Sequence, residues 1–165
     1  MDFKHDILPL KDKLFRLALR ITMNREESED IVQDTLIKLW QMRDELNKVE
    51  NLESFALKMA HNLALDRKGK LENRNISLDE TAHDRTDEHQ PSPFSALVQS
   101  GTHSLIASII NSLPNKQRTV IQLRDIEGKT YKEIADILSI SEADVKITLF
   151  RARNKIKEQW QTSNR

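Results

Sequence analysis

Residues 130–156 read TYKEIADILSISEADVKITLFRARNKI, a pattern that predicts two short helices joined by a tight turn. Thr130 and Glu133 form a candidate capping box at the first helix start, because hydroxyl and carboxylate can each bond an unpaired backbone N–H. Ser141 and Asp144 repeat this spacing at the second start. The pattern is typical of a helix-turn-helix, although an αα-hairpin in any helical bundle has the same outline.

The second of these helices has two unlike faces. Its inner face consists of apolar residues at helical spacing, namely Val145, Leu149, Ala152 and Ile156. Its outer face mixes apolar and polar or cationic groups, namely Lys146, Ile147, Phe150, Arg151 and Asn154. A solvated face has no use for large apolar groups, whereas the DNA major groove offers thymine methyls to them and guanine acceptors to Arg or Lys. We therefore predict a DNA-reading helix, followed by cations suited to phosphates: Arg153, Lys155 and Lys157.

Composition restricts the fold to a helical class. The 165 residues include only three Gly and four Pro, too few for the many turns of a β-sandwich. With 5% aromatic and 32% charged residues, the chain is suited to small helical cores. The absence of cysteine excludes disulfides and thiolate metal sites. With neither an apolar N-terminal region nor an apolar run near 18 residues, we expect a cytoplasmic protein without membrane insertion.

The formal net charge of zero conceals an uneven distribution. Residues 71–100 carry 2 Lys/Arg and 6 Asp/Glu, whereas residues 101–165 carry 11 and 7. Because local field governs the approach to DNA, the C-terminal part can still bind nucleic acid.

Apolar periodicity predicts three helices in the first 70 residues. The first starts near Leu8, and the second runs from about Arg25 to Met42 behind a cap formed by Asn24 and Glu27. The third begins at Leu52. We expect its inner face to contain Leu52, Phe55, Met59 and Leu63.

Two further faces in this part carry candidate binding residues. The second helix has a mixed acidic and apolar face, either simply solvated or able to dock a partner helix; it comprises Asp30, Gln33, Asp34, Ile37 and Gln41. The third helix presents amide, imidazole and cationic groups that can stack on or bond unpaired bases. These residues are Lys58, His61, Asn62, Asp66, Arg67, Lys68 and Lys70. The basic end alone is also explained by the helix dipole.

Residues 71–101 lack this periodicity and are predicted to be a flexible acidic linker. Its metal-ligating side chains have no helical spacing, so we expect no metal site from His83, Asp84, Asp87, Glu88 and His89. Residues 102–165 should form a four-helix unit that includes the helix-turn-helix, with Pro114 at a helix start and Gly128 as a left-handed cap. The prediction is an all-α chain of two small helical domains.

Three segments carry a family resemblance when taken in order. They are EESEDIVQDTLIKLWQMRDEL, SFALKMAHNLALDRKGK and LPNKQRTVIQLRDIEGKTYKEIADILSISEADVKITLFRARNKI. Together they resemble a bacterial sigma factor, in the two-domain form of the extracytoplasmic-function (ECF) group of the sigma-70 family. The resemblance covers roughly residues 5–70 and 102–158 and leaves the linker uncovered. One departure is Ser139, at a turn position often filled by glycine, which costs up to about 1 kcal/mol where φ is positive.

The resemblance implies a role for each candidate face. It implies a core RNA polymerase contact at Asp30, Gln33, Asp34, Ile37 and Gln41. It implies melting and reading of the −10 promoter element at Ser54, Lys58, His61, Asn62, Asp66, Arg67 and Lys68. It implies reading of the −35 element at Ser141, Lys146, Ile147, Phe150, Arg151 and Arg153. It assigns sigma region 2 to residues 1–70, the linker to 71–101 and region 4 to 102–165.

The expected function is that of a sigma factor directing core polymerase to promoters, without catalytic residues, metal or cofactor, and with an anti-sigma factor as a further partner. The alternative is a free-standing helix-turn-helix regulator whose N-terminal domain dimerises or senses a ligand. A hydrolase or metal enzyme would need a nucleophile–base set or a ligand cluster. The five histidines fall on separate predicted elements and form no such set.

Overall fold

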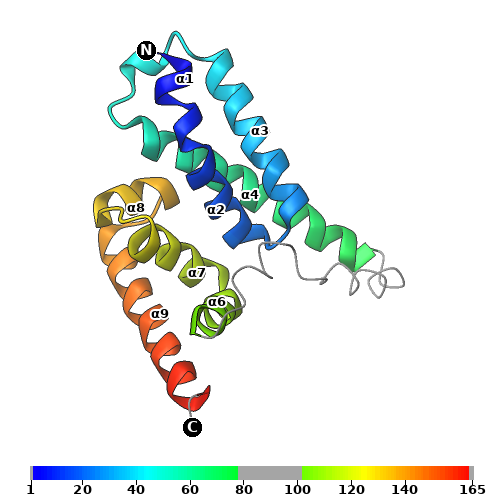
Figure 1. Ribbon diagram of the computed structural model, residues 1–165, viewed down its shortest axis with the longest axis vertical. Helices are drawn as coiled ribbons and strands as arrows, with labels where there is room; N and C mark the ends of the chain where they lie inside the picture. Colours follow the sequence, from blue (N-terminus) through cyan, green and yellow to red (C-terminus); the bar gives the residue numbers. More distant parts are fainter. Residues whose placement is uncertain (1, 78–101, 164–165) are drawn as a thin grey trace.

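The computed structural model describes residues 2–77 and 102–163, and in these ranges every regular element is a helix (Figure 1). This confirms the predicted all-α class. Most of the predicted linker, residues 78–101, lies outside the described residues, as do the histidines and carboxylates considered there as metal ligands. Within the described ranges, no helix is both long and apolar enough to cross a membrane.

The N-terminal unit packs three longer helices around a small apolar core. Its elements are α1 (Phe3–Asp6), a 3-10 turn (Leu8–Leu10), α2 (Lys11–Thr22), α3 (Arg25–Gln41), a second 3-10 turn (Leu46–Lys48) and α4 (Leu52–Ser77). Asn24 caps α3 as predicted, since its side chain accepts a bond from the backbone N–H of Glu27 at 3.0 Å. The preceding residue, Met23, closes α2 in the left-handed conformation with φ of 54°.

Helix α4 differs from the prediction in two respects. It continues through Ser77, so residues 71–77 are helix and not the start of the linker. The large side chains expected on its inner face, Leu52, Phe55, Met59 and Leu63, are only partly buried against the core. The fully buried side chains are Ala56, Leu57, Ala60 and Ala64. Small side chains at helical spacing let α2 and α3 approach the α4 backbone closely, and the larger neighbours then lie at the edges of the contact.

The C-terminal unit contains four α-helices, as predicted. They are α6 (Thr102–Ser112), α7 (Asn115–Ile121), α8 (Tyr131–Leu138) and α9 (Glu142–Ser163), with a π-helical turn (Gln122–Ile126) after α7. Pro114 occupies the N-cap of α7, one position before the predicted one. Gly128, with φ of 72°, reverses the chain ahead of α8.

The corner between α8 and α9 has the expected helix-turn-helix geometry. Thr130 and Glu133 form the complete capping box. The backbone N–H of Glu133 donates to the Thr130 hydroxyl at 3.1 Å, and the backbone N–H of Thr130 donates to the Glu133 carboxylate at 3.0 Å. Ser139 ends α8 in the left-handed region, with φ of 57°. The apolar sides of both helices are buried: Ile134, Ala135, Val145, Leu149 and Ala152.

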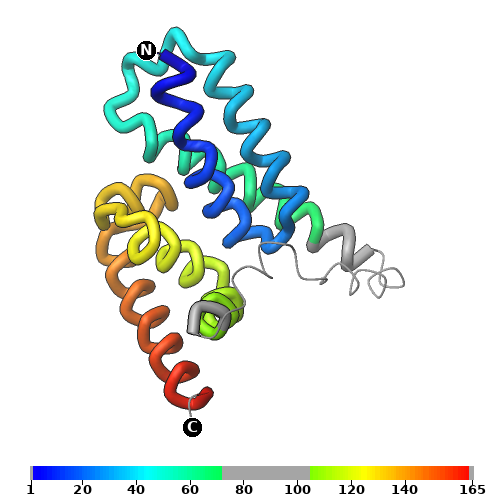
Figure 2. The backbone as a smooth tube through the Cα atoms, in the orientation of Figure 1, coloured from blue at the N-terminus to red at the C-terminus, as the bar shows by residue number. Residues whose placement is uncertain are grey.

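The two units lie against each other (Figures 1 and 2). Helix α7 packs on α2, and α8 packs on α4. Buried apolar side chains of both units belong to one continuous cluster. The described residues therefore form a single body in which α9 projects away from the N-terminal unit.

Candidate functional site

The outer face of α9 has the exposure that a reading helix needs. Ile147 is 50% exposed and Phe150 is 67% exposed, and Lys146 and Arg151 are exposed beside them. At the helix start, Ser141 accepts a bond from the backbone N–H of Asp144 at 3.0 Å. The apolar and cationic groups predicted to read DNA thus share one accessible surface.

The charge of Asp144, at the start of this face, is locally neutralised. Both carboxylate oxygens accept bonds from Lys116 of α7, at 2.7 and 2.9 Å, and Thr148 donates a further bond at 3.1 Å. Lys116 first, then the Thr148 hydroxyl and the charge of Arg151, hold the pKa of Asp144 below its ordinary value. The negative charge of Asp144, which would repel incoming phosphates, is therefore offset by Lys116, a partner that sequence spacing does not reveal.

Arg153 differs from the other predicted −35 residues. Its guanidinium bonds the carboxylate of Asp125 at 2.6 and 3.2 Å. This contact also raises the pKa of Arg153. The side chain connects α9 to the π-helical turn and remains 50% exposed, so its predicted contact with DNA stays a prediction.

The acidic face of α3 is exposed as expected, except at Asp34. Asp30, Gln33 and Gln41 are exposed, and Ile37 is 53% exposed. Asp34 is partly covered because Arg67 reaches over from α4 and bonds it. The predicted polymerase-binding face therefore has an apolar centre and an acidic end.

Arg67 joins two sites that the sequence predicts as separate. Besides Asp34, it bonds Glu27 at 3.1 Å and Asp30 at 3.2 Å. Partial burial alone would lower the pKa of Arg67, but the bonds that it donates to Glu27 and Asp30, together with the negative charge of Asp34, more than offset this, so its pKa is raised. In this conformation, Arg67 is engaged by the α3 carboxylates and is not a free donor for the −10 strand.

The remaining predicted −10 residues divide into an accessible and a covered set. Lys58, Asn62 and Asp66 are exposed along α4, and Lys68 near its end is partly buried. His61, predicted to lie among them, is only 7% exposed, and burial lowers its pKa while a contact with Asn62 opposes that shift. His61 points into the protein because the alanine stripe turns that side of α4 inward. Ser54 is 9% exposed for a different reason: it lies beneath the C-terminal unit.

Ser54 and nearby Asn51 both bond Glu133, the acidic member of the α8 capping box. The Ser54 hydroxyl donates to Oε2 of Glu133 at 3.1 Å, and the Asn51 amide donates to the same oxygen at 2.9 Å. Asn51 also caps α4. Its backbone carbonyl accepts a bond from the Phe55 N–H at 3.0 Å, and its side-chain oxygen accepts one from the Ser54 N–H at 3.1 Å. The sequence analysis missed Asn51, although an Asn directly before a helical stripe is a recognisable N-cap.

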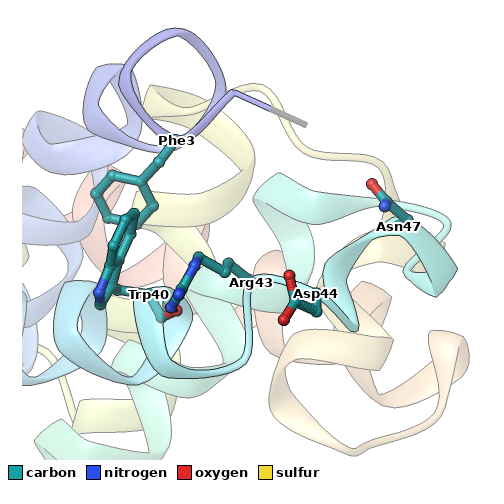
Figure 3. Close-up of a pocket in the computed structure, with 5 residues that line it drawn as sticks. All are labelled: Phe3, Trp40, Arg43, Asp44 and Asn47. Carbon is teal, nitrogen blue, oxygen red and sulfur yellow. The ribbon is translucent and has the colours of Figure 1, made fainter.

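A second residue missed by the sequence analysis is Trp40, which is 49% exposed at the end of α3. Figure 3 shows it between Phe3, whose ring lies edge-on at 5.1 Å, and Arg43, whose guanidinium lies 4.2 Å from the Trp40 ring centroid. These side chains line a hollow of about 370 Å³ together with Asp44 and Asn47. Trp40 follows Ile37 by three residues, so the helical spacing that identified the α3 face would also have included it.

Sequence comparison matches both units to parts of one family. Sigma-70 region 2 matches residues 7–74, and sigma-70 region 4 matches residues 103–156. The ECF RNA polymerase sigma factor SigE of Mycolicibacterium smegmatis is 27% identical over 155 residues, which cover 89% of this chain and 57% of SigE. The ECF sigma factor SigW of Bacillus subtilis is 29% identical over 157 residues, covering 90% of this chain and 83% of SigW. The chain thus spans little more than half the length of SigE.

Structural comparison finds the same fold. The sigma factor RpoE of Bartonella quintana, solved in complex with the anti-sigma factor NepR, superposes with a TM-score of 0.73. The match covers 97% of both chains at 23% sequence identity. The likeness therefore extends over both helical units.

Proposed function

The chain belongs to the ECF group of the sigma-70 family, and we propose that it directs core RNA polymerase to specific promoters and assists melting of the −10 element. In this proposal, the N-terminal unit through the end of α4 acts as region 2, the residues between α4 and α6 as the linker, and the C-terminal unit as region 4. Polymerase supplies the chemistry of RNA synthesis, and this chain contributes binding surfaces only. It therefore acts in the cytoplasm, where polymerase works.

The observation that carries the proposal is the outer face of α9. Phe150 at 67% and Ile147 at 50% exposure would be costly on a surface with no partner, and they lie beside Lys146 and Arg151. In a major groove, the apolar pair would contact thymine methyls and the cations would bond guanine. We assign the −35 contacts to these residues together with Ser141, and we leave Arg153 a supporting role through Asp125.

The second support is the α3 face, which suits a protein partner. Ile37 and Trp40 form an exposed apolar pair about one helical turn apart. Gln33, Gln41 and Asp30 border this pair. Apolar centres with polar rims are typical of protein interfaces. We assign this face to core polymerase, with Trp40 added to the residues predicted from sequence.

The −10 contacts are proposed for the accessible side of α4, at Lys58, Asn62 and Asp66, with Ser54 available once the C-terminal unit moves away. An anti-sigma factor is a proposed regulatory partner, because the sigma factor RpoE of Bartonella quintana, which has the same fold, is bound to the anti-sigma factor NepR. A free-standing regulator is less well supported, since both units of the chain, and not the helix-turn-helix alone, match sigma-70 regions.

The test is transcription in vitro from a promoter library with purified core polymerase. We expect initiation at a defined set of promoters when this chain is added, and none above background with core alone. Ile37→Glu should abolish that initiation by placing a charge in the apolar centre of the α3 face, whereas Lys38→Glu, exposed on the same helix but outside the face, should retain it. Unaided binding to duplex DNA, without stimulation of polymerase, would contradict the proposal.

A further inference from the structure

Helix α1 lies outside the residues that match sigma-70 region 2, which begin at residue 7, yet it packs onto the polymerase-binding face proposed for α3. The contact is made by Phe3, whose ring meets the Trp40 ring edge-on, with centroids 5.1 Å apart and ring planes at 83° (Figure 3). Edge-to-face pairs of this kind attract each other beyond the apolar area that they bury. Helix α1 therefore adds to the α3 face a contact that the family match does not include.

A second side chain contacts the same ring. The guanidinium of Arg43 lies 4.2 Å from the Trp40 ring centroid, and its Nη1 donates a bond to the Trp40 backbone carbonyl at 2.9 Å. This bond fixes the guanidinium over the ring, where the cation and the negative face of the aromatic system attract each other. Phe3 and Arg43 thus hold the Trp40 ring from two different elements, α1 and the turn that follows α3.

Helix α1 has only four residues, but both of its ends are anchored. At its start, the Asp2 side chain accepts a bond from the Lys4 N–H at 3.1 Å, and at its end the Ile7 N–H donates to the Phe3 carbonyl at 2.9 Å. The Ile7 side chain is fully buried in the core. Because so short a helix has little stability of its own, this buried residue and the Trp40 contact are what keep Phe3 in place.

The restraint on Trp40 matters because much of its side chain stays accessible to a partner. Trp40 is 49% exposed, and it borders a hollow of about 370 Å³. An exposed side chain ordinarily moves between rotamers, and a partner that binds it must first order it, which reduces affinity. A ring that is already held in one orientation avoids that loss.

We propose that Phe3 and Arg43 are positioning residues for core polymerase, which act through the Trp40 ring that they hold in place. The inference rests on the proposed function, which assigns the α3 face to polymerase. It requires that Phe3 contributes to polymerase affinity only while Trp40 is present. A direct contact between α1 and polymerase, or a general effect on stability, would act whether or not Trp40 is there.

The first experiment measures the ring itself, without polymerase. The chain has two tryptophans, so Trp160→Phe leaves Trp40 as the only one, and its fluorescence anisotropy reports its motion. Phe3→Ala should lower the anisotropy and raise quenching by acrylamide, whereas Phe3→Tyr, which keeps an aromatic edge, should leave both near the values of the parent protein. Leu8→Ala is the control, because it shortens an exposed apolar side chain of the same segment that does not line the hollow. An anisotropy unchanged by Phe3→Ala would overturn the inference.

The second experiment is a double-mutant cycle on core polymerase binding, measured by titration of the full chain. Phe3→Ala should weaken binding by about two- to tenfold, the range expected for one aromatic pair. In a Trp40→Ala background the same change should have no further effect, and Phe3→Tyr should bind like wild type. An equal loss in both backgrounds would contradict the positioning role, because Phe3 would then act without Trp40.

The same cycle with Arg43→Ala tests the second positioning residue. We expect a loss of affinity when Trp40 is present and none in the Trp40→Ala background. A loss in both backgrounds would show that the cation acts on polymerase directly, and it would remove Arg43 from the inference. The two possible failures are distinguishable: if the wild-type chain does not bind core polymerase, the proposed function fails and the inference falls with it. If the chain binds and the cycles are additive, only the positioning role is refuted.

Discussion

Arg67 holds three carboxylates of α3 against α4, and its replacement by glutamine should destabilise the fold measurably. The side chains of Arg67, Glu27 and Asp34 are 26%, 29% and 41% exposed, and that of Asp30 is 63% exposed. At this exposure, each ion pair contributes about 0.2–1 kcal/mol, because solvent screens it. Arg67→Gln removes all three pairs and leaves the carboxylates to repel one another. We expect a loss of about 1–2 kcal/mol in the free energy of unfolding.

The assay is thermal and urea unfolding followed by circular dichroism. For a chain of 165 residues, a loss of this size lowers the melting temperature by about 2–8 °C. Lys58→Gln is the matched control, because it removes an exposed cation from the same helix and should change stability by less than about 0.5 kcal/mol. High salt should reduce the difference between the two variants, since screening weakens the pairs. Equal stability of the two variants at low salt would show that the Arg67 cluster does not hold α3 to α4.

Four further predictions follow from single residues. Phe150→Ala should change −35 preference in a promoter-library assay while leaving stability within about 0.5 kcal/mol, because the side chain is 67% exposed; an unchanged preference would remove Phe150 from the reading face. Trp40→Ala should weaken core polymerase binding by about 1–2 kcal/mol in a titration. The control is Trp160→Ala, which removes a partly buried tryptophan near the end of α9, far from the α3 face, and equal affinities of the two variants would exclude Trp40 from the interface. Ser139→Gly should stabilise the fold by up to about 1 kcal/mol in urea unfolding, since φ is 57°, and a loss of stability would contradict the strain argument. Bonds from the Thr130 N–H, then from Asn51 and Ser54, lower the pKa of Glu133 from 4.5 to about 2. The contribution of ionised Glu133 to stability is therefore present above pH 4.5 and is lost as pH falls towards about 2. The difference in stability between wild type and Glu133→Gln should narrow from pH 4.5 to about 2, and a constant difference would refute the prediction.

Local features were accessible from the sequence because they depend on neighbours in the chain. The Thr130–Glu133 capping box and the Asn24 cap follow from spacing alone, and both are present. Ser139 was identified as standing at a turn position often filled by glycine, and the structure gives it a positive φ. The two faces of α9 were also separated correctly, because a 3.6-residue period fixes which side chains lie together.

Contacts between distant segments were not accessible in the same way. Arg67 looks like one of several basic residues at a helix end, and only the packing of α4 on α3 reveals its carboxylate partners. The prediction for the inner face of α4 was incomplete. The four large residues predicted there are partly buried against the core, but the fully buried positions are Leu57 and three alanines, which close helix packing favours. His61 was placed outside for the same reason. The pairing of Arg16 with Glu127, 111 residues apart, depends on how the two units dock.

The most direct test of the central claim, that this chain is a promoter-opening sigma factor, is permanganate reactivity of thymines around the −10 region of a promoter selected from the library. We predict reactive, unpaired thymines only when the chain and core polymerase are both present, and loss of that signal with Ile37→Glu. A signal absent from the complete mixture, together with protection of a palindromic duplex by the chain alone, would contradict the account and favour a free-standing helix-turn-helix regulator.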